Sequence, residues 1–165
     1  MQPIVVKRAT LESIPDIQAV ARQVWPVTYG NVISGDQLNY MLDKFYSTES
    51  LTRQMTEEGQ QFIMATEFDM VLGFASYSHL GDGIYKLHKL YVFTYQQGKN
   101  VGRRLLRYVV EDIRTRNAKR LILNVNRYNR AKLFYERLGF EVLEEVDIPI
   151  GNGYYMNDFV MGKEL

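Results

Sequence analysis

The chain has 165 residues, of which 46% are hydrophobic and 24% are charged. This length favours one domain over 1–165, and the composition allows a core that folds without a metal or a disulfide. The 20 lysines and arginines against 19 acidic residues give a formal net charge of +1, which argues against a general nucleic-acid binder. Cysteine is absent, so disulfides, cysteine-ligated metals and thiol nucleophiles are excluded.

The sequence also indicates no targeting or membrane segment. The first residues lack the basic-then-apolar order of a signal peptide, and no apolar run approaches the roughly 18 residues that a membrane helix needs. The two histidines, His79 and His88, cannot form an all-histidine metal site. We therefore expect a cytoplasmic protein with no metal, no membrane partner and no nucleic-acid partner.

The N-terminal third predicts one strand and then helices. A β-rich run covers 3–8, and a helix begins after Thr10. Apolar residues recur at helical spacing as far as Trp25, and Pro26 predicts a stop or a kink. Two more helices are expected, over 36–45 and 49–59.

Strands and helices then alternate. Two strands over 62–65 and 71–77 flank a turn, and Gly81-Asp82-Gly83 predicts a hairpin into a strand over 84–93. From Val101, apolar residues every fourth position predict an amphipathic helix. The remaining elements are a strand over 120–125, a helix over 129–138, a strand over 140–146 and a last strand at Val160 and Met161. This order predicts an α/β (α+β) fold, with a mixed sheet of six to seven strands flanked by four to five helices.

The sharpest local signal is the loop Gln97-Gly98-Lys99-Asn100-Val101-Gly102-Arg103-Arg104 between a strand and a helix. A helix N-terminus carries unpaired N–H groups and a partial positive charge, and therefore attracts anions. The glycines let the backbone approach an anion, while three basic side chains add charge. The spacing matches neither a P-loop nor a dinucleotide fingerprint. An ordinary loop with a solvated basic face is the alternative.

Two segments together resemble the coenzyme motifs of the GNAT superfamily of N-acetyltransferases. Leu90-Tyr91-Val92 and the loop 97–102 resemble its acetyl-CoA segment, whose pattern is Gln/Arg-x-x-Gly-x-Gly/Ala. The segment from Asn129 to Phe140, which contains Phe134-Tyr135, is similar to the family's second coenzyme segment. Asn100 stands where the pattern usually has glycine. Because asparagine tolerates a positive φ, we expect the loop to form, with an altered coenzyme affinity as an open question.

The resemblance implies a set of contacts to acetyl-CoA. Main-chain groups of 90–92 would pair with the pantetheine arm, and N–H groups from Gln97 to Arg103 would hold the pyrophosphate. The sheet would splay between its fourth and fifth strands, near Val92 and Val125, commonly with the help of a bulge. The implied coenzyme-binding residues are Leu90, Tyr91, Val92, Gln97, Gly98, Lys99, Asn100, Val101, Gly102, Arg103 and Asn129.

The chemistry needs a neutral amine. Deprotonating an alkyl ammonium with a pKa near 10.4 costs about 4.6 kcal/mol at pH 7. His88 is a candidate base, because relatives often carry a glutamate suspected as base there and an unperturbed imidazole has a pKa of about 6.5. His79 and water are alternatives, and His88 could also be an ordinary half-buried strand residue. Strand alternation predicts one shared face for four residues: Lys86, His88, Leu90 and Val92.

Tyr135 is the candidate general acid, since the resemblance places it near the sulfur of the coenzyme. A phenol with a pKa near 10 can protonate a thiolate with a pKa near 8.5. Packing beside Phe134 and Leu138 is its alternative role. The resemblance also places the N–H of Val92 at the oxyanion. Without cysteine, the acetyl group would pass directly to the acceptor.

The acceptor is expected to bind among aromatic side chains. Aromatic residues gather in the helical N-terminal region and near the last strand, where relatives wall the acceptor pocket: Trp25, Tyr29, Tyr40, Tyr46, Tyr154 and Tyr155. Aromatic faces hold cationic amines, and Asp36, Asp43 or Asp158 would add negative charge. Core or dimer packing is the alternative for most of them. The proposed substrate contacts are Trp25, Tyr29 and Tyr155.

The leading hypothesis is an acetyl-CoA-dependent N-acetyltransferase that acts on a small amine. The segment 151–158 also resembles small-amine, polyamine-type acetyltransferases. A protein or peptide acceptor, an acyl-CoA-binding regulator with weak activity, and nucleic-acid binding through the stripe Arg103–Arg116 are the alternatives. A homodimer is possible.

Overall fold

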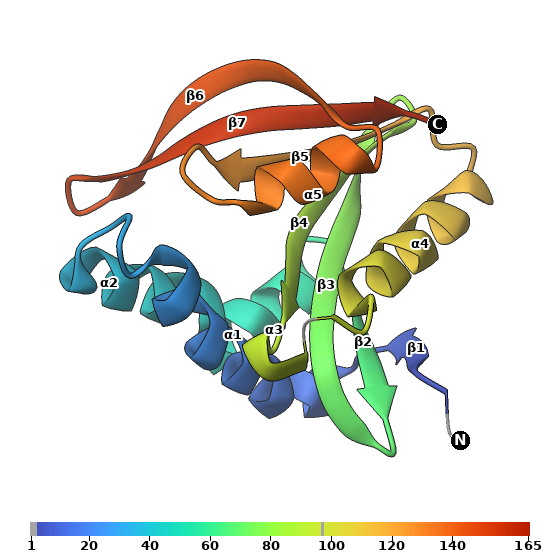
Figure 1. Ribbon diagram of the computed structural model, residues 1–165, viewed down its shortest axis with the longest axis horizontal. Helices are drawn as coiled ribbons and strands as arrows, with labels where there is room; N and C mark the ends of the chain where they lie inside the picture. The colour runs from blue at the N-terminus through green and yellow to red at the C-terminus, as the bar shows by residue number, and fades with distance from the viewer. Residues whose placement is uncertain (1–2, 97) are drawn as a thin grey trace.

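The computed structural model describes residues 3–96 and 98–165. In these residues seven strands form one sheet, accompanied by five α-helices and two short 3-10 helices (Figure 1). This confirms the predicted order of elements and the mixed α/β architecture. Gln97, one of the expected coenzyme contacts, lies outside the described residues.

The elements have the following bounds. The strands are β1 (Val5–Arg8), β2 (Gln61–Glu67), β3 (Met70–Gly81), β4 (Ile84–Val92), β5 (Arg120–Asn126), β6 (Glu141–Gly151) and β7 (Tyr154–Glu164). The helices are α1 (Ile14–Tyr29), α2 (Gly35–Tyr46), α3 (Thr48–Thr56), α4 (Val101–Arg114) and α5 (Ala131–Arg137). The 3-10 helices are η1 (Leu11–Ser13) and η2 (Thr94–Gln96).

The strand order is β1-β2-β3-β4-β5-β7-β6, and only β4 and β5 run parallel to each other. Their pairing starts at Ile84 opposite Arg120 and ends at Leu87 opposite Leu123. Both strands continue beyond that point, β4 to Val92 and β5 to Asn126, with no further pairs between them. The ends of β4 and β5 are thus unpaired with each other near Val92 and Val125, the place where the family resemblance implies a splay.

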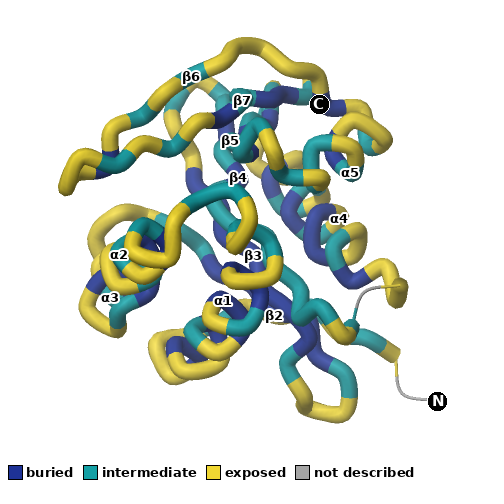
Figure 2. The backbone as a smooth tube through the Cα atoms, turned by 60° about the vertical axis from the view of Figure 1, so that its left-hand side comes forward, coloured by how far each residue is buried: buried dark blue, intermediate teal, exposed yellow. Residues whose placement is uncertain are grey.

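Helices cover both faces of the sheet (Figures 1 and 2). On one face, α1, α2 and α3 bury an apolar cluster that includes Ile17, Leu51 and Phe74, each fully buried. On the other face, α4 and α5 bury a second cluster, which includes Leu105 and Ile113 from the predicted apolar stripe of α4. The sheet is therefore the middle of three layers, and its two faces lead to two separate cores.

A β-bulge in β4 overturns the expected strand parity. Ser76 of β3 pairs with Lys89, whereas the next residue pairs with Leu87, so His88 is an extra residue on β4. Because a bulge shifts the alternation by one position, the side chains before and after it exchange faces. Leu90 packs against the α4 core, whereas His88 lines a cavity on the α1–α3 side. The prediction of one shared face is therefore wrong.

Several element boundaries also differ from the prediction, and two of these differences bear on the shape of the site. Helix α1 does not stop at Pro26 but continues to Tyr29, and the N–H of Gly30 donates to the carbonyl of Pro26 at 3.0 Å. In the last turn, proline removes a single intrahelical hydrogen bond, while burial of Trp25 anchors the same turn. The strand expected over 140–146 runs on to Gly151, which makes β6 and β7 a long hairpin.

The tip of this hairpin is fastened to α2. The hydroxyl of Tyr40 donates to the carbonyl of Ile150 at 2.8 Å, and the ammonium of Lys44 donates to the same carbonyl. One turn earlier in α2, the amide of Gln37 donates to the carbonyl of Tyr155 at 2.8 Å. These contacts hold the hairpin over the α1–α3 side of the sheet.

The described residues hold no group of three or more histidine, aspartate or glutamate side chains placed to bind a metal ion. No helix among them is long and apolar enough to cross a membrane.

Replacing Gly151 by alanine should loosen the hairpin tip. Gly151 has φ of +92°, and a Cβ there would lie 2.6 Å from the Tyr40 hydroxyl. We expect Gly151→Ala to lower the free energy of unfolding by roughly 2–3 kcal/mol in urea titrations, because it adds a steric conflict to backbone strain. Gly153→Ala is the control, since its φ of +78° imposes similar strain but no atom lies within 4 Å. Equal losses in both variants would contradict the contact with Tyr40.

Candidate active site

The loop before α4 forms one end of the site. Asn100 is the N-cap of α4 and has φ of 58° and ψ of 30°, so it adopts the left-handed conformation expected of it. The first intrahelical hydrogen bond is donated by Arg104 to the carbonyl of Asn100. The N–H groups of the three residues between them have no partner within the helix. These residues, 101–103, line a cavity together with Gly98 and Asn100.

This cavity has a volume of about 890 Å³ and is here called the large cavity. Its other walls come from β4, from α1, from the segment that joins β5 to α5 and from α5 itself. Predicted coenzyme and catalytic residues in its lining are Leu90, Tyr91, Val92, Gly98, Asn100, Val101, Gly102, Arg103, Asn129 and Tyr135. The fold therefore brings together residues from four separate segments that the family resemblance assigned to one ligand.

Lys99 is the exception among the described coenzyme candidates. It does not line the large cavity, and its ammonium lies 3.2 Å from the carboxylate of Glu67. Arg103 is the member of the predicted basic set that does line the cavity. In the lining of the large cavity, Arg103 and Arg130 supply basic side chains, and the N-terminus of α4 adds a partial positive charge.

Tyr135 lies in α5 and is 6% exposed. Its ring packs edge-to-face on Phe134 and Phe140, with centroid distances of 5.2 and 5.6 Å. Burial raises the pKa of Tyr135, and the neighbouring Tyr29 raises it further. The phenol is therefore protonated at neutral pH, which is the form that donates a proton.

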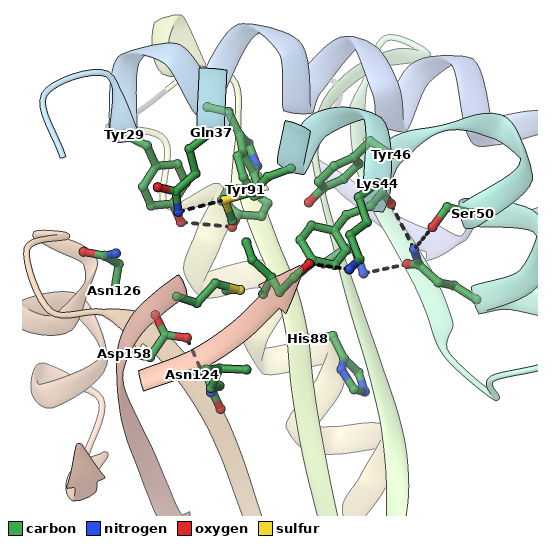
Figure 3. Close-up of a pocket in the computed structure, with 18 of the residues that line it drawn as sticks. Tyr29, Gln37, Lys44, Tyr46, Ser50, His88, Tyr91, Asn124, Asn126 and Asp158 are labelled. Carbon is green, nitrogen blue, oxygen red and sulfur yellow. Dashed lines mark hydrogen bonds between the residues drawn. The ribbon is translucent and has the colours of Figure 1, made fainter. Parts of the chain in front are cut away.

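A second cavity, of about 510 Å³, lies on the α1–α3 side of β4 and is here called the small cavity (Figure 3). The three proposed substrate contacts, Trp25, Tyr29 and Tyr155, all line it, as does His88. Tyr46 and Asp158 also line it. The other residues suggested for the acceptor do not line the small cavity. Tyr40 and Tyr154 pack on each other, whereas Asp36 and Asp43 are exposed.

Tyr91 lines both cavities. Its hydroxyl lies 3.1 Å from that of Tyr29, as Figure 3 shows, and its ring lies 5.9 Å from the ring of Trp25. Burial raises the pKa of both tyrosines. These residues therefore form the boundary at which a group held in one cavity can meet a group held in the other.

His88 is a weaker base than its residue type suggests. Its Nε2 shares a hydrogen bond of 2.6 Å with the hydroxyl of Ser78. Burial, together with the charges of Lys89 and Lys86, lowers the pKa of His88 to about 4. The imidazole is therefore neutral at pH 7 but binds a proton poorly. His79 is exposed, stacks on Tyr85 and lines neither cavity.

Sequence reasoning missed several polar residues of the small cavity. They are Gln37, Gln54, Gln60, Lys86, Lys89, Asn124 and Asn126. Two lysines inside an otherwise apolar strand were the available signal for Lys86 and Lys89. The bulge at His88 places the side chains of Lys86 and Lys89 on the same face of the sheet. Nothing in the local sequence pattern indicates that bulge. Asn124 and Asn126 alternate with buried apolar residues of β5, which indicates a polar face on that strand.

Comparison with known proteins agrees with this geometry. A family model described as the acetyltransferase (GNAT) domain matches residues 30–151. The uncharacterized N-acetyltransferase YuaI of Bacillus subtilis is 27% identical over 153 residues, or 89% of this chain and 86% of the relative.

Solved structures show the same fold. PaiA N-acetyltransferase from Thermoplasma acidophilum, in complex with coenzyme A, has a TM-score of 0.83 at 23% identity, covering 99% of each chain. A GCN5-related N-acetyltransferase from Rhodopseudomonas palustris has a TM-score of 0.84 at 19% identity, covering 100% of this chain and 98% of that one. With the family match over residues 30–151, these findings lead to one conclusion: the chain belongs to the GNAT acetyltransferase family.

Proposed function

We propose that this single-domain protein transfers an acetyl group from acetyl-CoA directly to a primary amine of a small molecule. The observation that carries the proposal is the pair of cavities that share Tyr91. One cavity is lined by the start of α4, by Asn129 and by Tyr135, and the other is an aromatic chamber. A thioester in the first would lie next to an amine in the second.

The large cavity suits coenzyme A in charge and in shape. The N–H groups at 101–103, with Arg103, offer a site for the pyrophosphate. Residues beyond Leu87 have no β5 partner, so main-chain groups at 90–92 have an open edge for the amides of pantetheine. The coenzyme A in the Thermoplasma structure, which shares this fold, supports the assignment.

An oxyanion site is available on the same edge. The N–H of Phe93 donates to the carbonyl of Leu72 on β3. Because successive N–H groups of a strand point in opposite directions, the N–H of Val92 is directed toward the unpaired edge. We assign it to the oxygen of the tetrahedral intermediate.

Proton transfer completes the reaction. The amine nitrogen attacks the thioester carbonyl, and the C–S bond breaks as the amide forms. The ammonium loses two protons: one goes to water before attack, and the other replaces the proton that Tyr135 donates to the sulfur. Burial raises the pKa of the Tyr135 phenol, and it would raise the pKa of the coenzyme thiol in the same way. The difference between these two pKa values therefore changes little.

The first proton is released to bulk solvent through water, so the reaction needs no base of the protein, and His88, whose pKa of about 4 lies far below that of an ammonium, is poorly suited to hold that proton. His88 lines the small cavity as a neutral hydrogen-bonding group. A small acceptor is favoured over a protein chain, because the β6–β7 hairpin is fastened to α2 at Tyr40 and Gln37 and covers the small cavity.

Removing the hydroxyl of Tyr135 tests its role as acid. We expect Tyr135→Phe to lower kcat by about 100-fold or more while the Kd for coenzyme A changes little, because the ring contacts remain. Thiol release with a chromogenic reagent measures kcat, and calorimetry measures Kd. Tyr128→Phe is the control, since Tyr128 lines the same cavity but is 73% exposed. Full activity in Tyr135→Phe would remove the tyrosine from the mechanism.

Filling the large cavity at the start of α4 tests the coenzyme site. A Cβ on Gly102 already lies 3.4 Å from Phe134, so we expect the indole of Gly102→Trp to occupy the cavity and abolish coenzyme A binding in calorimetry. Arg104→Trp places the same side chain on the same turn but outside the cavity lining, and it should bind coenzyme A normally. Normal binding by Gly102→Trp would overturn the assignment.

The pH dependence of kcat/KM tests the part played by His88. Its proton is bound only as the pH falls through about 4, so the group is already unprotonated throughout the neutral range. We therefore expect His88→Gln to keep any activity limb that the wild type shows near neutral pH, with His79→Gln as the control. If the limb disappears in His88→Gln alone, His88 titrates near neutrality and is the base.

A further inference from the structure

Charge is distributed unevenly in the small cavity. Four basic and two acidic side chains line it: Lys44, Arg53, Lys86, Lys89, Glu58 and Asp158. Arg53 already has a partner, since its guanidinium lies 3.4 Å from the carboxylate of Glu49. The three lysines have no carboxylate within 4.0 Å among the described residues.

The basic end of the small cavity is built around Lys89. Its ammonium donates to Gln54 at 2.6 Å and to Gln60 at 3.1 Å, and it lies 5.4 Å from the ring centroid of Phe62. Burial, assisted by Lys86, lowers the pKa of Lys89 to about 7 against the opposing influence of Glu58. A buried cation whose hydrogen-bond partners are both neutral amides is costly, and a bound anion would relieve that cost.

The other end of the small cavity holds Asp158. Burial raises the pKa of its carboxyl, while Asn124, Lys86 and Arg127 lower it. Asp158 of β7 is 1% exposed, and its carboxylate accepts a hydrogen bond from Asn124 at 3.5 Å. Figure 3 shows Asp158 and Asn124 on one side of the cavity, whereas Lys44 and Ser50 lie on the other. Ser50 accepts a hydrogen bond from Gln54, the partner of Lys89, so Lys89 belongs to the basic side.

Resting on the proposed function, we propose that the acceptor carries an anionic group, a carboxylate or a phosphate, in addition to its primary amine. The amine binds at Asp158, the end nearer to Tyr29 and Tyr91, and the anionic group binds between Lys44 and Lys89. A simple polyamine would place its second cation among these lysines. This arrangement therefore disfavours the polyamine-type acceptor that the segment 151–158 suggested.

A panel of amines matched in length tests the proposal on the wild-type protein. The arms are γ-aminobutyrate and ε-aminocaproate, O-phosphoethanolamine, the neutral-tailed butylamine and hexylamine, and the diamines putrescine and cadaverine. We expect kcat/KM for the best anionic acceptor to exceed that for the best diamine or alkylamine by about tenfold or more. The aminocarboxylate and phosphate arms distinguish the two anions. Equal or better acetylation of diamines would overturn the inference while leaving the acetyltransferase proposal standing.

Variants locate the two ends. Lys89→Met should raise KM for the anionic acceptor about tenfold or more and leave KM for hexylamine within about twofold. Lys44→Met should do the same, and it leaves the hydrogen bonds of Gln54 and Gln60 to Lys89 in place. Asp158→Asn should raise KM for both kinds of acceptor. Lys7→Met removes the same charge from exposed β1 and should change neither value. Equal effects of the lysine variants on both acceptors would contradict the assignment.

Binding separates this inference from the proposed function. Calorimetry with ε-aminocaproate and with hexylamine, on the protein saturated with coenzyme A, needs no turnover. Suppose that ε-aminocaproate binds more tightly than hexylamine, that Lys44→Met abolishes this difference, and that no amine in the panel is acetylated. This result would support the anionic subsite and would overturn acetyl transfer to small amines. Binding of hexylamine at least as tight as that of ε-aminocaproate would overturn the subsite.

Discussion

The end of pairing between β4 and β5 is the constraint on which the rest of this site depends. Beyond Leu87, β4 pairs on the β3 side alone, and His88 is bulged. The unpaired edge exposes main-chain groups that an extended ligand can use, and the bulge turns Lys89 and Tyr91 toward the α1–α3 layer. The end of pairing and the bulge lie next to each other on β4, between the large cavity and the small cavity, and Tyr91 lies in the lining of each.

Burial then determines the protonation states around this boundary. The pKa values of Tyr29, Tyr91 and Tyr135 are all raised, so the hydroxyls stay protonated at neutral pH. The same burial lowers the pKa values of His88 and Lys89. A site in which groups are held neutral favours hydrogen bonding and makes each remaining charge more effective, because few water molecules screen it. In the complex that we propose, the lysines and Asp158 would act on the acceptor in this setting.

Much of the fold followed from the sequence because its signals are local. The apolar stripe of α4 and the positive φ of Asn100 depend on neighbours within a few residues, and both were confirmed. The grouping of the coenzyme residues came from the family resemblance. What escaped prediction depends on contacts across the sheet. The bulge at His88 is visible only in the register with β3, and the diversion of Lys99 needs Glu67 from β2. Asp158 was one of three aspartates suggested for the acceptor, and the pairing of β5 with β7 decides that it is the one that reaches the small cavity.

A crystal structure of the protein with coenzyme A tests the central claim most directly. The account predicts the pyrophosphate on the N–H groups of residues 101–103, the pantetheine along the unpaired edge of β4, and the sulfur beside Tyr91 and Tyr135 at the boundary with the small cavity. A coenzyme bound elsewhere, or one whose sulfur points away from Tyr91 into solvent, would contradict it.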